Sequence, residues 1–372
     1  MPDAATIASA MAIDARSGDA RRAAPGAERT DTIRHAFIDA NHLRFHVALA
    51  GEGMGEGARE PLAGAASGRP LVVFLHGFPE CWYSWRHQLR ALAPHAACVA
   101  PDLRGYGDSD KPRSGYDLDS LADDVAALVR ALGRERATIV GHDWGGVIAW
   151  HLAARRPEAV ERVAILNAPP KDVLLDRILE SPAQAARSWY IAFFLLPGLP
   201  ELWLGADGAA NVPRIFLGGA RRRAGFTSED LDVFRRALAK PGAVESALAY
   251  YRTAVRDSLD ALRPARALGA AVSALARRLP AAVRGLVPGL PGANAGAPPR
   301  GRRRIACPGL VLWGVDDPGL GVELTYRFKD LFSGPFELRY IDGCGHWTQQ
   351  EAPEIVNEAL LRFIGATPGR RD

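Results

Sequence analysis

Cysteine is scarce in this chain of 372 residues, and none of its four copies stands in the CxxC spacing of a metal or redox motif. Cys81, Cys98, Cys307 and Cys344 therefore offer no zinc-ligand pair and no disulfide framework, and we interpret them as buried or incidental thiols in a reducing compartment. Residues 1–30 alternate charge with alanine and lack the sustained apolar core of a secretory signal or membrane anchor. We therefore expect a cytoplasmic protein.

A strong excess of one charge is also missing. The chain has 46 Lys and Arg residues and 42 Asp and Glu residues, which gives a formal net charge of +4. Arginine clusters at 21–22, 221–223 and 302–304 have no nucleic-acid recognition motif beside them, so we interpret them as solvated surface and expect no nucleic acid as a partner. Hydrophobic residues make up 48% of the chain, which suffices for the full core of a globular enzyme.

Short apolar segments alternate with helix-like segments along most of the chain. This alternation predicts an α/β fold with a mostly parallel sheet flanked by helices. We expect helices directly after the residue-143 turn and at residues 117–132 and 351–364. We expect strands at residues 36–39, 43–50, 71–75, 97–103, 137–141, 160–167, 309–314 and 336–341.

The alternation stops between residues 170 and 261, where helical and aromatic segments show no buried-strand pattern. A helical segment inserted between sheet strands is typical of a lid over a binding site. We therefore divide the chain into a disordered tail at 1–33, an α/β core at 34–169 and 305–366, a helical lid at 170–261, and an insert rich in Ala, Arg, Pro and Gly at 262–304.

The insert at 262–304 has two interpretations. Leu268, Val272, Leu275 and Leu279 have helical spacing and are interleaved with arginines. A basic amphipathic helix of this kind can contact a membrane surface. An alanine-rich segment exposed to solvent satisfies the same pattern, so peripheral membrane contact stays an open alternative.

Asp143 stands between Gly141 and Gly145 in the segment GHDWGG, after an apolar run and before a helix-like one. This frame predicts a nucleophile elbow, a sharp strand-to-helix turn that presents one side chain. Glycine is required there because a Cβ would collide in so tight a turn. An aspartate at the tip can attack an electrophilic carbon and become an ester. The structural alternative for a lone aspartate before a helix is an N-cap.

A nucleophile needs a base, and the base needs an acid that orients it. In enzymes built around such an elbow, the acid follows a late strand and the histidine precedes the last helix. His346 has the histidine's place, and Asp316 and Asp317 both follow a late strand. We assign Asp317 as the acid and keep Asp316 as the alternative. The backbone N–H groups of Phe78, in the HGFPE turn, and Trp144 are assigned to an oxyanion hole.

Four segments resemble the soluble epoxide hydrolases of the α/β-hydrolase fold: HGFPECWYSWRHQLRALA, DLRGYGDSDKP, GHDWGG and GHWTQQEAPE. The resemblance implies that Asp143 opens an epoxide, that His346 activates water against the resulting ester, and that two lid tyrosines hold the epoxide oxygen. The segments SWYIAFFLLPG and AYYRTA assign these tyrosines to Tyr190 and Tyr251. The resemblance implies no metal and no organic cofactor.

The same resemblance, with the apolar lid segment WYIAFFLLP, predicts a pocket for a small apolar epoxide. We expect six further side chains at this pocket: His76, Pro79, Trp189, Phe194, Tyr250 and Trp347. The segment NAPPK at 167–171 departs from the family's NxPHP.

Two other functions stay open. One is a haloalkane dehalogenase with the same nucleophile, although Phe78 stands where that family often carries an asparagine. The other is a non-catalytic binder of small molecules. The oligomeric state is left undetermined.

Overall fold

The computed structural model describes residues 33–51, 69–278 and 304–366, and for residues 261–278 it describes the helical backbone alone. The expected tail up to residue 32, and residues 279–303 of the expected insert, lie outside the described residues. The sheet and the helices packed on it are formed by residues 33–51, 69–169 and 304–366.

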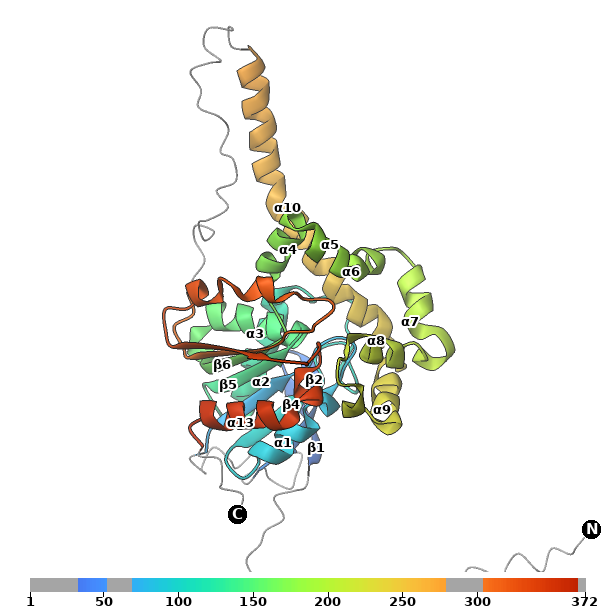
Figure 1. The fold of residues 1–372 in the computed structure, drawn as a ribbon, viewed down its shortest axis with the longest axis vertical. Helices are drawn as coiled ribbons and strands as arrows, with labels where there is room; N and C mark the ends of the chain where they lie inside the picture. Colours follow the sequence, from blue (N-terminus) through green and yellow to red (C-terminus); the bar gives the residue numbers. More distant parts are fainter. Residues whose placement is uncertain (1–32, 52–68, 279–303, 367–372) are drawn as a thin grey trace, which may run out of the picture.

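An eight-stranded sheet forms the centre of the molecule, in the order β1-β2-β4-β3-β5-β6-β7-β8 (Figure 1). β1 and β2 pair antiparallel, β2 and β4 pair antiparallel, and all other neighbours are parallel. The predicted α/β class with a mostly parallel sheet is therefore confirmed, and each expected strand is present. The strands are β1 (Arg34–Ala40), β2 (Leu43–Ala50), β3 (Leu71–Leu75), β4 (Ala97–Pro101), β5 (Ala137–His142), β6 (Val160–Leu166), β7 (Gly309–Gly314) and β8 (Phe336–Ile341).

Helices cover both faces of the sheet, which is why its central strands are apolar on both sides. In β3, Val73 belongs to the core cluster on one face, and its neighbour Phe74 belongs to the cluster on the other. Successive side chains of a strand point to opposite faces, so a continuous apolar run such as LVVFL supplies both cores. The first face is covered by α2 (Leu118–Ala131) and α3 (Trp144–Arg155), and the second by α1 (Arg86–Leu92) and α13 (Pro353–Phe363).

A helical segment interrupts the core between β6 and β7 and lies beside and above the sheet in Figure 1. It contains the region that we predicted to be a lid. Short elements complete the core: α12 (Thr348–Glu351) and 3₁₀ turns at Trp82–Trp85, Pro157–Ala159, Val322–Thr325 and Phe328–Leu331. The helical segment consists of α4 (Lys171–Glu180), α5 (Pro182–Arg187), α6 (Trp189–Phe194), α7 (Leu199–Ala209), α8 (Val212–Gly219), a 3₁₀ turn at Arg223–Gly225, α9 (Ser228–Leu238) and α10 (Ala243–Arg278).

α10 is 36 residues long and extends away from the body of the molecule (Figure 1, orange). The boundary that we placed at residue 262 falls inside this helix, because the alanine-rich sequence beyond it consists largely of strong helix formers. Within the ranges given above, no helix combines the length and the apolar character that crossing a bilayer requires.

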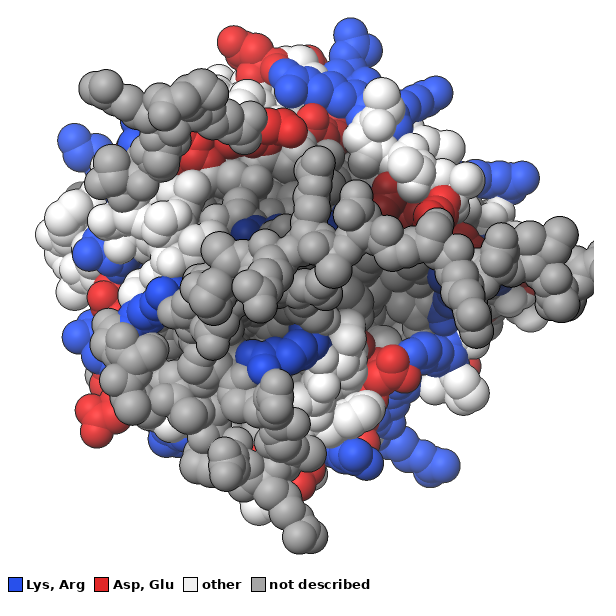
Figure 2. All heavy atoms as spheres, turned by 90° about the horizontal axis from the view of Figure 1, so that it is seen from below, with Lys and Arg blue, Asp and Glu red and all other residues white. Residues whose placement is uncertain are grey.

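The molecular face in Figure 2 bears basic and acidic side chains that are interspersed among its described residues. Many of the arginines pair with nearby carboxylates, as in the contact of Arg156 with Asp123 at 2.7 Å and that of Arg235 with Asp232 at 2.7 Å. Exposed pairs of this kind add little to stability, but they are typical of a solvated enzyme surface.

Candidate active site

Asp143 occupies a strained turn between β5 and α3, with φ 49° and ψ −121°. Glycines make the turn possible: a Cβ at Gly145 would lie 2.1 Å from the Leu75 carbonyl oxygen, and a Cβ at Gly141 would lie 2.3 Å from the Gly145 oxygen. A non-glycine residue at positive φ is strained and is held only by a well-determined surrounding structure. The segment GHDWGG therefore forms the expected elbow, with Asp143 at its tip.

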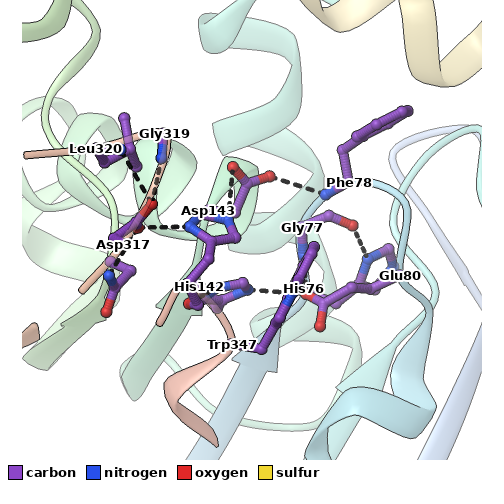
Figure 3. A network of polar contacts seen from close by, with 12 residues as sticks. His76, Gly77, Phe78, Glu80, His142, Asp143, Asp317, Gly319, Leu320 and Trp347 are labelled. Carbon is purple, nitrogen blue, oxygen red and sulfur yellow. Dashed lines mark hydrogen bonds and ion pairs between the residues drawn. The ribbon is translucent and has the colours of Figure 1, made fainter. Parts of the chain in front are cut away.

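Asp143 and Asp317 lie near each other beyond the carboxyl ends of the strands (Figure 3), and His346 contacts both carboxylates. His346 Nδ1 lies 2.7 Å from Asp317 Oδ2, and His346 Nε2 lies 3.6 Å from Asp143 Oδ2. The neighbouring Asp316 is exposed, and its carboxylate lies 4.0 Å from Arg221 Nε. The structure thus brings Asp317, and not Asp316, to the histidine.

Asp317 is held as a carboxylate by several donors. Its Oδ1 accepts the N–H groups of Gly319 at 2.8 Å and Leu320 at 3.0 Å, and its Oδ2 accepts the Asn167 amide at 2.8 Å. Burial by itself would raise the pKa of Asp317, but the charge of His346 and these hydrogen bonds outweigh burial and lower it. Asn167 was not among the expected site residues, although the unusual NAPPK segment begins with it.

His346 has a carboxylate on each side. Burial alone would lower its pKa, but Asp317 and Asp143 together raise the pKa of His346 well above its usual value. The resting site therefore holds a protonated histidine between two carboxylates. When one of these carboxylates loses its charge, the pKa of His346 falls and the imidazole becomes available as a base.

The Asp143 carboxylate is ionised in the resting site. Burial opposes its charge, but His346, the neighbouring His142 and a backbone hydrogen bond from Phe78 lower the pKa of Asp143. The Phe78 N–H donates to Asp143 Oδ1 at 2.8 Å. Trp144 begins α3, where the first N–H groups have no acceptor within the helix. Phe78 thus donates directly to the Asp143 carboxylate, and the Trp144 N–H stands at the start of α3, next to Asp143 in the chain.

A cavity of about 590 Å³, its open mouth included, lies over Asp143. Tyr190 of α6 and Tyr251 of α10 both line it, with their ring centroids 6.2 Å apart. Burial and the charge of Asp143 raise the pKa of both tyrosines, so both hydroxyls stay protonated at neutral pH. The structure therefore places two phenol donors and one carboxylate around the same space.

The six side chains expected at the substrate pocket are outside the lining of this cavity, and three of them make structural hydrogen bonds. His76 is fully buried and accepts the Leu103 N–H at 3.0 Å. The Tyr250 hydroxyl donates to the Arg104 carbonyl at 2.8 Å, and the Trp347 indole donates to a carbonyl of α8 at 2.9 Å. These side chains serve the packing of the elbow and the lid.

The other three expected side chains also lie outside the lining, two of them in the lid and one in the turn after β3. Trp189 is 66% exposed, because α6 turns Tyr190 and Ile191 to the cavity and the residue before them to solvent. Phe194 is buried behind the cavity and packs edge-on against Tyr251. Pro79 is buried in the turn after Phe78.

The sequence did not reveal a buried contact between a histidine and a glutamate beneath the elbow. His142 Nδ1 contacts Glu80 at 2.8 Å, and His142 Nε2 contacts the His346 carbonyl at 2.9 Å (Figure 3). Glu80 also accepts the Gly77 N–H and the amides of Gln349 and Gln350. Both ring nitrogens of His142 thus face acceptors, so Glu80 and the His346 carbonyl fix the orientation of the ring beneath the elbow.

Glu351 is a second residue whose role the sequence did not reveal. Its carboxylate accepts the N–H groups of Gly345 and Trp347, each at 3.0 Å, on both sides of His346. It also accepts the N–H groups of Arg221 and Arg222, each at 2.7 Å, from the segment after α8. Glu351 therefore joins the histidine loop to the lid. Glu80 lies in the segment HGFPE and Glu351 in the segment GHWTQQEAPE. Their place in these two motifs was the signal by which the sequence could have indicated them.

Comparisons with known proteins agree with the fold described above. Residues 70–353 match the family model described as alpha/beta hydrolase fold. The chain is 32% identical to human Epoxide hydrolase 4, over 89% of this chain and 78% of that protein. It is 34% identical to Epoxide hydrolase A of Mycobacterium tuberculosis, over 88% of this chain and 96% of that protein.

Solved structures agree with the sequence matches. The crystal structure of Epoxide Hydrolase A from Mycobacterium thermoresistibile superimposes with a TM-score of 0.66 at 29% identity, over 89% of this chain and 98% of the other. The expected resemblance is therefore confirmed over the core and the helical segment together. The chain belongs to the α/β-hydrolase-fold family, within the group formed by the epoxide hydrolases.

Proposed function

We propose that this protein hydrolyses an epoxide to a vicinal diol through a covalent ester of Asp143. The arrangement of Asp143 under Tyr190 and Tyr251 carries the proposal, because it pairs a carboxylate nucleophile with two acids for an opening ring. The relatives named Epoxide hydrolase support the same reaction. Halide displacement by the same nucleophile requires no acid at a developing alkoxide, so the tyrosine pair favours the epoxide.

In the first half-reaction, Asp143 attacks one carbon of the ring. Oδ1 accepts the Phe78 N–H, which leaves Oδ2 as the attacking atom. The ring C–O bond breaks, and its oxygen takes a proton from Tyr190 or Tyr251, both of which stay protonated until that moment. The product of this step is a hydroxyalkyl ester of Asp143.

In the second half-reaction, His346 activates water against the ester carbonyl. Esterification removes the negative charge of Asp143, so the pKa of His346 falls and its proton passes through solvent to the tyrosinate. The neutral imidazole then accepts a proton from water. Asp317 orients the ring through Nδ1. The carbonyl oxygen is Oδ1, and it becomes an oxyanion next to the N–H groups of Phe78 and Trp144. When the intermediate breaks down, His346 gives this proton to the leaving alkoxide and the diol departs. The carboxylic acid formed at Asp143 then transfers its proton to His346, which restores the resting site.

A single turnover in oxygen-18 water tests the covalent step. With enzyme in excess over styrene oxide, the added diol oxygen comes from Asp143, so the first diol is expected to be unlabelled. The label is expected in the peptide that contains Asp143, because water attacks the ester carbonyl. Mass spectrometry of diol and peptide reads both positions. A labelled diol with an unlabelled peptide would show that Asp143 acts only as a general base.

Replacement of the orienting acid is expected to affect the second half-reaction more than the first. Asp317→Asn leaves an amide opposite His346 Nδ1 and disturbs the ring's tautomer, so hydrolysis of the ester is expected to slow on the order of a thousandfold. Rapid-quench measurement of ester formation and decay separates the steps. Asp316→Asn is the matched control, because its carboxylate is exposed. The opposite ranking of the two variants would overturn the assignment.

A further inference from the structure

Gln184 is a fully buried amide in α5 of the helical segment, and its side chain reaches a loop of the core. Its Nε2 donates to the Gly319 carbonyl at 2.8 Å, and its Oε1 accepts the Gly321 N–H at 3.2 Å. Both partners are backbone groups of the loop that follows β7. Burial of an amide is unfavourable unless it is hydrogen-bonded, and these two contacts meet that requirement.

The same loop holds the acid of the triad (Figure 3). Asp317 Oδ1 accepts the N–H groups of Gly319 at 2.8 Å and Leu320 at 3.0 Å. The N–H groups of residues 319 and 320 therefore bind Asp317, while the carbonyl of residue 319 and the N–H of residue 321 bind Gln184. Gln184 thus supports the peptide groups that fix the Asp317 carboxylate.

Gln184 also contacts the helix that carries Tyr190. Its Nε2 donates to the Ser188 hydroxyl at 2.9 Å, and Ser188 is the N-cap residue of α6. The Tyr190 ring lies against the same loop, because a Cβ at Gly319 would stand 3.8 Å from Tyr190 Cε1. One buried amide therefore joins the loop of the triad acid to the beginning of the helix that presents a lid tyrosine.

We infer that Gln184 is a positioning residue, which holds the loop at 319–321 and so keeps the Asp317 carboxylate directed at His346 Nδ1, 2.7 Å away. The inference rests on the proposed hydrolysis and adds a residue of the helical segment to the support of its base. Gln184 is outside the lining of the cavity over Asp143, so its effect on the reaction passes through the loop. The orientation of the triad acid then depends on how α5 docks on the core.

Gln184→Met tests this role, because it retains the size of the side chain but leaves the Gly319 carbonyl and the Gly321 N–H without their partner. The loop is expected to shift, and hydrolysis of the Asp143 ester is expected to slow by between about tenfold and a hundredfold, as a small misplacement of a catalytic group does. Ester formation does not use His346 as a base, so it is expected to slow less. Rapid-quench measurement of ester formation and decay separates the two rates.

The pH dependence of ester hydrolysis distinguishes positioning from a loss of folded protein. His346 must be neutral to accept a proton from water, so hydrolysis accelerates with pH through the pKa of His346 in the esterified enzyme. The charge of Asp317 raises that pKa, and a displaced Asp317 raises it less, so the midpoint in Gln184→Met is expected to move to lower pH. Asp143 is an ester in this state, and the His142 ring, 4.8 Å from that of His346, is the same in both proteins. A smaller folded fraction would lower only the amount of ester formed.

Ser188→Ala is the matched control. It removes the contact with α6 and keeps both contacts with the loop, so ester hydrolysis is expected to retain the parent rate and midpoint. If Gln184→Met does not fold, Gln184→Asn replaces it, because its amide is one methylene shorter and cannot make both loop contacts. The parent midpoint in the glutamine variant, or the same shift in Ser188→Ala, overturns the inference.

A measurement without substrate keeps this inference distinct from the proposed function. If no epoxide is hydrolysed, the hydrolase assignment fails, and NMR of enzyme with nitrogen-15-labelled histidine tests the contact alone. The proton in the short, charge-assisted hydrogen bond between His346 Nδ1 and Asp317 is expected to give a downfield signal, identified by its loss in Asp317→Asn. In Gln184→Met the signal is expected to move upfield or to broaden, and in Ser188→Ala it is expected to stay. An unchanged signal in Gln184→Met overturns the inference.

Discussion

Replacement of His346 by glutamine is expected to stop turnover and to leave the enzyme esterified at Asp143. His346 Nε2 lies 3.6 Å from the nucleophile, and in the proposed reaction it is the base for the second half-reaction only. Loss of a general base costs on the order of a thousandfold. Ring opening uses Asp143 and the tyrosines, so ester formation is expected to continue. Intact-mass spectrometry under saturating epoxide is expected to show a gain equal to the mass of the epoxide.

Two controls define this result. His151→Gln changes a histidine on the outer side of α3, paired with Asp119, and is expected to leave turnover unchanged. Asp143→Asn combined with His346→Gln removes the nucleophile, so no mass gain is expected. Unmodified protein after incubation of His346→Gln with a substrate of the parent enzyme would contradict the two-step reaction.

Removal of both lid hydroxyls is expected to abolish ring opening almost completely. Loss of one donor to a developing oxyanion typically costs on the order of a hundredfold, so Tyr190→Phe and Tyr251→Phe are each expected to slow ester formation by about that factor. In the double variant, the rate of ester formation is expected to fall at least ~1000-fold. The combined effect depends on how far one tyrosine substitutes for the other when only one is replaced. Pre-steady-state measurement of ester formation checks both magnitudes.

The fold is expected to survive these two substitutions, since they retain the rings. The Tyr251 ring packs edge-on against Trp144 with centroids 5.0 Å apart, and the Tyr190 ring packs against Phe194 at 5.8 Å. Tyr340→Phe is the matched control, because it removes a hydroxyl that contacts Thr325 at the outer strand β8. Parent-rate turnover by the double variant would show that the lid assignment is wrong.

Local sequence patterns were sufficient for the architecture. Apolar runs such as LVVFL predict strands covered on both faces, since each successive side chain must enter one of two cores. The elbow at Asp143 could also be predicted from the sequence. Its glycines are needed because a Cβ at those positions would collide with backbone atoms of the same turn or of the adjacent strand. The boundary at residue 262 rests on a change of composition, and α10 continues across it because helix propensity does not change there.

The sequence by itself therefore determined the sheet, the elbow and the chain order of nucleophile, acid and histidine, because these depend on periodicity and on steric rules that act over short distances. Only the tertiary structure decided which aspartate reaches His346, since Asp316 and Asp317 are adjacent in the chain and differ in the direction that their loop gives them. It also decided the lining of the cavity, where Trp189 turns outward and Tyr190 turns inward. That outcome depends on how α4, α6 and α10 dock over β5 and β6, through contacts between segments far apart in the sequence, which no local pattern encodes.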